Sequence, residues 1–169
     1  ISKALSDRWV AKLGLQAGLL RYVSRLNFQD VNQTQASVGL LHRGSGPRQW
    51  TVEGSLIAAN DDNTQSQSPF GRDVYGSRLQ FGFALGAGRV FATASAIRSD
   101  YDGLFAGERR RDNQQSLVLN WVVEDFLAKN WVFSPEVVYV NNDSNSVLFD
   151  YERSWVAINI RRRFSTSSR

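Results

Sequence analysis

The sequence contains no cysteine and a single histidine, and these shortages exclude several kinds of chemistry. Without cysteine the chain has no disulfide, no thiolate metal site and no cysteine nucleophile. It also lacks any run of about 20 consecutive apolar residues, which a membrane-spanning helix needs, although hydrophobic residues make up 42% of the chain. A helical membrane protein is therefore excluded.

Charge of one sign does not gather in any segment that resembles a nucleic-acid site. The net charge is +4, but acidic and basic residues are interspersed. No basic run with flanking aromatics follows a strand, so we expect no nucleic-acid partner. The length of 169 residues suits one domain. The chain begins Ile-Ser-Lys-Ala-Leu without a charged and then apolar leader, which predicts a mature product or a piece of a longer protein.

What the sequence does contain is an alternation of apolar and polar residues in segments of about ten residues, which is typical of transmembrane β-strands. In the clearest segment, residues 75–85, large apolar side chains alternate with Arg78, Gln80 and glycines. Seven further segments alternate, near residues 9–19, 35–40, 50–58, 90–97, 116–123, 131–139 and 156–164. Within residues 90–97 the pattern leaves open which set faces lipid, the one that includes Val90 and Ala92 or the one that includes Phe91 and Ile97.

These segments predict an all-β, antiparallel up-and-down transmembrane β-barrel of about eight strands in the cell outer membrane. We expect barrel strands over residues 1–164 and a tail over residues 165–169. Short turns (44–47, 86–88 and 125–130) alternate with longer polar loops (23–33, 60–73, 99–112 and 141–152). This order puts every short turn on one side of the membrane, the periplasmic side in known barrels.

Aromatic residues at strand ends support the same topology, because Trp and Tyr favour the membrane interface. The aromatics predicted to lie there are Trp9, Trp50, Tyr75, Trp121, Trp131 and Tyr139. Tyr22 and Tyr101 are expected near the loop ends. The last segment ends on Ile158, Ile160 and Phe164, the pattern of an insertion signal read by the barrel-insertion machinery, although Arg162 interrupts its alternation.

The polar face of the strands is predicted to line the lumen. Its residues are Lys12, Gln16, Glu53, Arg78, Gln80, Asn120, Glu136, Asn159 and Arg161. In a closed eight-stranded barrel, side chains fill the interior and these charges would pair, since an isolated charge there is costly. In a wider barrel they would line a slightly basic aqueous channel. A soluble barrel or sandwich also alternates, but it would turn the larger apolar face inward.

Catalytic and metal sites are not expected. Nucleophilic catalysis needs Ser, His and a carboxylate together, whereas His42 lies at a strand end beside a turn and the long loops contain no histidine. The runs Asp61-Asp62-Asn63 and Asn141-Asn142-Asp143 lack the spacing of a calcium loop and favour polar loop tips. The run Arg109-Arg110-Arg111 either binds lipopolysaccharide phosphates or is neutralised by Glu108 and Asp112.

One stretch resembles the carboxyl-terminal strands of tetratricopeptide-linked outer-membrane proteins, especially the surface lipoprotein assembly modifier (Slam) family. The sequence segments that resemble this family are residues 107–112, 131–139, 142–145, 150–153 and 161–164, about a third of the chain. It implies that the chain is the last part of a larger barrel. Residues 5–9 read as a periplasmic turn into an upward strand, so residues 1–4 would end an earlier strand. The family's helical repeats do not occur in this sequence.

The function predicted from these patterns is a barrel that conducts or exports material across the outer membrane, as a porin or translocon component. The alternative is a closed, non-conducting barrel that anchors surface loops or a partner. We expect no enzymatic activity and no cofactor. The expected partners are outer-membrane lipid and lipopolysaccharide, the insertion machinery during biogenesis, and an exported protein or polysaccharide.

Overall fold

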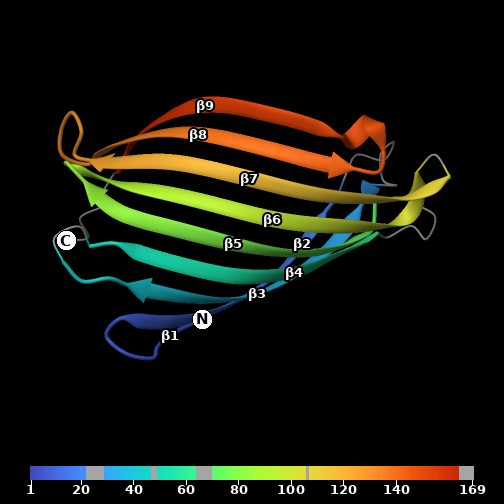
Figure 1. Cartoon of the computed structure of the whole chain (residues 1–169), viewed down its shortest axis with the longest axis horizontal. Coiled ribbons are helices and arrows are strands. Elements are labelled where there is room, and N and C mark those ends of the chain that lie inside the picture. Colours follow the sequence, from blue (N-terminus) through green and yellow to red (C-terminus); the bar gives the residue numbers. More distant parts are fainter. Residues whose placement is uncertain (22–28, 47–48, 64–69, 106, 164–169) are drawn as a thin grey trace.

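A computed structural model describes residues 1–21, 29–46, 49–63, 70–105 and 107–163 as one antiparallel sheet (Figure 1). Its nine strands follow one another in chain order, each paired with the next. They are β1 (Ser2–Ala4), β2 (Trp9–Leu20), β3 (Val31–Arg43), β4 (Thr51–Asn63), β5 (Arg72–Leu85), β6 (Gly88–Phe105), β7 (Glu108–Glu124), β8 (Trp131–Ser144) and β9 (Tyr151–Arg162). The described ranges include the 3-10 turn η2 (Val147–Phe149), and no helix in them is long and apolar enough to cross a membrane.

The predicted class, an all-β antiparallel up-and-down sheet, is confirmed. The eight long strands correspond to the eight alternating segments, and β1 is the short strand end expected before residue 5. In Figure 1 the sheet is strongly curved, and β2 passes behind the middle strands. Among the described residues β1 pairs only with β2, and β9 pairs only with β8, so the sheet has two open edges.

The strand connections gather at two ends of the sheet. The short connections β1–β2, β3–β4, β5–β6 and β7–β8 lie at the left in Figure 1, and we name this the turn end. The others lie at the opposite, loop end. The prediction of a long loop over residues 99–112 is wrong, because β6 and β7 continue through it to Phe105 and Glu108. The turn there includes Gly107 with a φ of 91°, a backbone angle that glycine adopts without the steric penalty that other residues meet.

Strand register assigns each residue to one of two faces, since directly opposed residues share a face. One set of opposed partners runs Leu13–Val38–Leu56 and, across the later strands, Leu79–Ala94–Leu117–Tyr139. This apolar side is the outer face. The register also decides the segment that the sequence left open: Val90 and Ala92 share the outer face with Trp121 and Leu119, whereas Phe91 lies opposite Asn120 on the other face.

The two faces differ in exposure as well as composition. Outer-face side chains are the more exposed, with Leu15 at 78%, Leu56 at 62% and Val156 at 70%. On the opposite face most residues of β4, β6, β7 and β8 are half-buried or buried, as expected for the inside of a curved sheet. We call this the concave face. The apolar residues therefore lie on the outside of the curve, which is the reverse of a soluble barrel.

Candidate functional site

The polar residues predicted to face a lumen all lie on the concave face. Lys12 and Glu53 come from β2 and β4, Arg78 comes from β5, and Glu136 and Arg161 come from β8 and β9. Their register partners include Gly39, Gln80, Ser95, Asn120 and Val132. The other residues of the prediction, Gln16, Gln80, Asn120 and Asn159, share the same face. The structure thus brings the whole set onto one surface.

An ion pair crosses one strand of this face. Lys12 Nζ donates to Glu53 Oε2 at 2.6 Å, reaching from β2 over β3 to β4. On the intervening strand β3, Gly39 is the register partner of Lys12 and Leu41 is that of Glu53. A Cβ at Gly39 would come within 3.1 Å of the Gly54 carbonyl oxygen. A cavity of 460 Å³ beside the pair is also lined by Arg78.

The other predicted charges on this face are not paired. Among the described residues Arg78, Glu136 and Arg161 make no ion pair and no side-chain hydrogen bond. The prediction of a fully paired polar core therefore holds for Lys12 with Glu53 but not for the remaining three. Unpaired charges are stable where water reaches them and costly where it does not.

Basic residues recur along one row of opposed partners on the concave face. The row crosses the sheet through Lys12, Gly39, Ser55, Arg78, Ser95, Ser116, Val140 and Arg153. We name it the basic row. It contains three cations and no carboxylate, and small residues separate the cations. The hydroxyls of Ser95 and Ser116 hydrogen-bond to each other at 2.7 Å.

Polar and aromatic groups pack together at the loop end of the concave face. Arg72 donates to Asp61 at 2.7 Å and to the Tyr101 hydroxyl at 3.3 Å. Arg110 pairs with the buried Asp112, and its guanidinium lies 4.3 Å from the Tyr101 ring centroid. We name this the loop-end cluster. Its remaining members are Ser144, which donates to Asp112 at 2.7 Å, and Phe149, whose ring centroid lies 3.4 Å from the Arg110 guanidinium.

The arginine run is divided between the two faces. Arg110 turns to the concave face, where Asp112 neutralises it, as one of the two predictions stated. Arg111 turns to the outer face and donates to Asp100 at 2.8 Å, and Arg98 donates to the same carboxylate at 2.9 Å. These three residues lie beyond the apolar part of the outer face. There the guanidiniums of Arg98 and Arg111 hold the pKa of the Asp100 carboxyl below its usual value.

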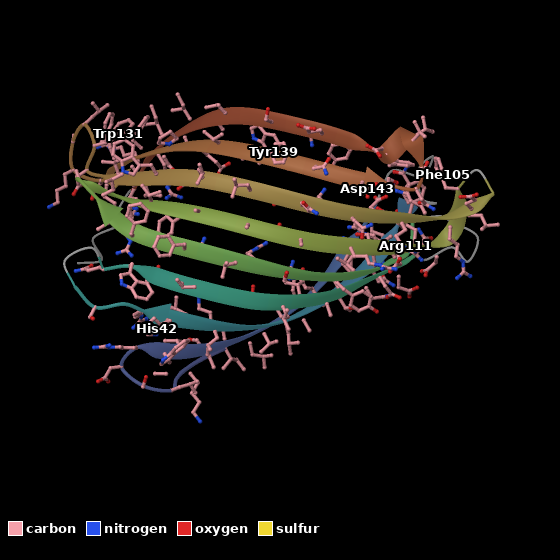
Figure 2. All side chains as sticks on the ribbon, in the orientation of Figure 1. His42, Phe105, Arg111, Trp131, Tyr139 and Asp143 are labelled. Atoms are coloured by element: carbon pink, nitrogen blue, oxygen red, sulfur yellow. The ribbon has the colours of Figure 1, made fainter. Side chains whose placement is uncertain are left out.

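The predicted interface aromatics lie on the outer face. Trp9, Trp121 and Trp131 are near the turn end, and Tyr75 and Tyr139 are nearer the loop end; Figure 2 labels Trp131 and Tyr139. Trp50 precedes β4 and its ring packs 6.4 Å from that of Phe81. Tyr101 lies near the loop end as expected, but on the concave face with Arg72, so it is not one of the outer-face aromatics. Tyr22 lies outside the described residues.

His42 occupies the outer face at the turn end (Figure 2). Its ring centroid lies 4.3 Å from that of Trp9 and 5.2 Å from that of Trp50. No described carboxylate or hydroxyl bonds its Nδ1, which is buried. The described residues contain no group of three or more His, Asp or Glu arranged to hold a metal ion.

Ile158 and Ile160 of the predicted insertion signal share the outer face of β9, and Phe164 lies outside the described residues. On the other side of the same strand, sequence reasoning missed Tyr151, Arg153 and Trp155. The Arg153 guanidinium lies 5.5 Å from the Tyr151 ring and 5.3 Å from the Trp155 ring. Because Tyr151, Arg153 and Trp155 alternate with Val156 and Ile158 along one strand, the sequence could have placed them on the face opposite those apolar residues.

Comparison of the chain with protein-family models, curated protein sequences and solved structures finds no match. The resemblance to the Slam family stays a prediction that none of these comparisons tests.

Proposed function

We propose that this chain forms strands of an outer-membrane β-barrel that conducts or exports material across the membrane. The observation that carries the proposal is the separation of the two faces: exposed Leu, Ile, Val and Phe side chains cover the outside of the curve, and the ionisable residues of the central strand segments lie inside. Soluble monomers rarely expose a continuous apolar surface of this extent, whereas a lipid-facing band requires one.

Strand direction favours a barrel that contains more strands than those described. Neighbours are antiparallel throughout, so β1 and β9, which are eight positions apart in the order, run in the same direction. Direct pairing of their free edges would be parallel, unlike an up-and-down barrel. Antiparallel closure on β1 needs at least one additional strand of the opposite direction. A wider barrel encloses a water-filled lumen, which suits the unpaired charges of Arg78, Glu136 and Arg161.

A closed, non-conducting barrel is the second candidate, and a specific observation favours it. If the short β1 were displaced, β2 could pair with β9 in the antiparallel sense and close an eight-stranded barrel. The Lys12–Glu53 ion pair and the packed loop-end cluster resemble the filled interior that such a barrel needs. The three unpaired charges argue against it.

The test is single-channel recording from the full-length protein reconstituted in planar bilayers. Discrete conductance steps support a water-filled lumen. A folded, inserted protein with no conductance at any voltage or pH contradicts conduction and favours the closed barrel. Gel mobility with and without boiling verifies folding in both cases.

A closed barrel and a water-filled barrel also predict different losses of stability when one charge of the Lys12–Glu53 pair is removed. Glu53→Gln would leave Lys12 without its carboxylate, at a cost of about 3–5 kcal/mol for a dry, buried pair. In a wet lumen the cost should stay near 0–1 kcal/mol, as for exposed pairs. Denaturant unfolding of Glu53→Gln therefore distinguishes the two candidates without relying on conductance.

A further inference from the structure

The concave face carries more unpaired positive than negative charge. Its cations in the strands are Lys12, Arg43, Arg72, Arg78, Arg89, Arg110, Arg153 and Arg161. Three of them, Lys12, Arg72 and Arg110, are neutralised by Glu53, Asp61 and Asp112. The other cations, Arg43, Arg78, Arg89, Arg153 and Arg161, have no carboxylate partner among the described residues, whereas the unpaired acids of these strands on the same face are Glu108 and Glu136.

The arrangement of these cations matters as much as their number. Arg78 and Arg153 belong to the basic row, separated by two serines and Val140. The intervening side chains are too short to cover them. Arg153 is held beside the rings of Tyr151 and Trp155, which fixes its position without neutralising its charge. A row of exposed guanidiniums on a pore wall attracts anions and repels cations.

We propose that the concave face selects anions over cations, with Arg78 and Arg153 as the specificity-determining residues. The proposal rests on the proposed function, since it assigns a substrate class to that lumen. Chloride is the simplest probe, and acidic or phosphorylated solutes belong to the same class. Glu136 works against the selection from the same wall.

The experiment is the reversal potential of the full-length protein in planar bilayers under a potassium chloride gradient. We expect chloride to be more permeant than potassium. Arg78→Gln and Arg153→Gln should each lower the chloride-to-potassium permeability ratio roughly twofold, the effect of removing one charge that acts through water over one Debye length of about 8 Å. Glu136→Gln should raise the ratio.

Arg98→Gln is the matched control, because it removes an arginine from the outer face and should leave the ratio unchanged. Gel mobility with and without boiling verifies that each variant is folded. A conducting protein that prefers potassium, or whose ratio none of the three concave-face substitutions changes, overturns the inference while leaving the pore in place. Absence of conductance in the folded protein overturns the proposed function and the inference with it.

Discussion

The lipid-facing role proposed for the outer face can be tested by placing one charge on either side of the same strand. Leu119 of β7 lies on the outer face with 44% of its surface exposed, beside Ala92 and Val137. Val118, the preceding residue, lies on the concave face between Thr93 and Val138. Leu119→Arg and Val118→Arg therefore add the same side chain at nearly the same depth, but on opposite faces.

The expected difference follows from the solvent that each face meets. An arginine on the lipid face near the middle of the bilayer costs about 2–4 kcal/mol, whereas substitutions on the lumen side are tolerated. Since about 1.4 kcal/mol corresponds to a tenfold change in an equilibrium constant, Leu119→Arg should reduce the folded-to-unfolded ratio between about 30-fold and about 700-fold. Val118→Arg should change it by less than about tenfold in a wet lumen.

The assay is reversible denaturant unfolding in lipid vesicles, followed by tryptophan fluorescence. Equal destabilisation by the two substitutions would refute the assignment of faces in a membrane. So would a neutral Leu119→Arg beside a strongly destabilising Val118→Arg, which is the result expected of a soluble barrel with its core inside.

Three further outcomes follow from particular contacts. Arg110→Ala should destabilise the protein by about 3–5 kcal/mol in denaturant unfolding, because it leaves the buried Asp112 without its cation; a loss below about 1 kcal/mol would mean that water reaches the loop-end cluster. Lipid-borne bromine should quench fluorescence of the outer-face tryptophans but not of Trp155, so Trp155→Phe should increase the quenched fraction, and an unchanged fraction would contradict its place on the concave face. Gly44→Ala should cost about 1–3 kcal/mol, since a Cβ there would lie 1.9 Å from the Trp50 ring and displace it from His42; unaltered thermal unfolding and near-ultraviolet circular dichroism would count against that packing.

The alternation of residues predicts the faces of the strands well because a side-chain period of two is fixed by backbone geometry. The pattern failed at residues 90–97, where Ala92 and Ser95 differ too little in polarity to choose a side, and only pairing with the less ambiguous β7 decides it. Tyr101 was predicted to lie with the interface aromatics, and not on the concave face, for a related reason. An aromatic residue near a strand end suits the interface by type, but its position in the register turns it toward Arg72.

Strand length was harder to predict than strand face. Residues 99–112 are polar and contain a triple arginine, which is typical of a loop, yet they pair as strands. The ion pair between Arg111 and Asp100 and the hydrogen bond that Ser144 of β8 donates to Asp112 stabilise the ladder there. These are cross-strand contacts, which a single segment of sequence does not reveal. The division of the basic residues into paired and unpaired sets depended on register for the same reason.

In the proposed topology, the length of the β6–β7 hairpin determines how far it reaches beyond the membrane. Eighteen residues of β6 extend about 60 Å at about 3.3 Å per residue, and a lipid-facing band is only about 25 Å tall. Even with the usual tilt, the tip at Phe105 and Glu108 stands well clear of the bilayer in the proposed topology. Backbone pairing is interrupted by an irregularity between Asp100 and Leu104 and resumes with Leu104–Arg109 and Phe105–Glu108. In the proposed topology the hairpin would therefore hold a paired tip, able to present an epitope or a receptor-binding surface, above the lipid headgroups.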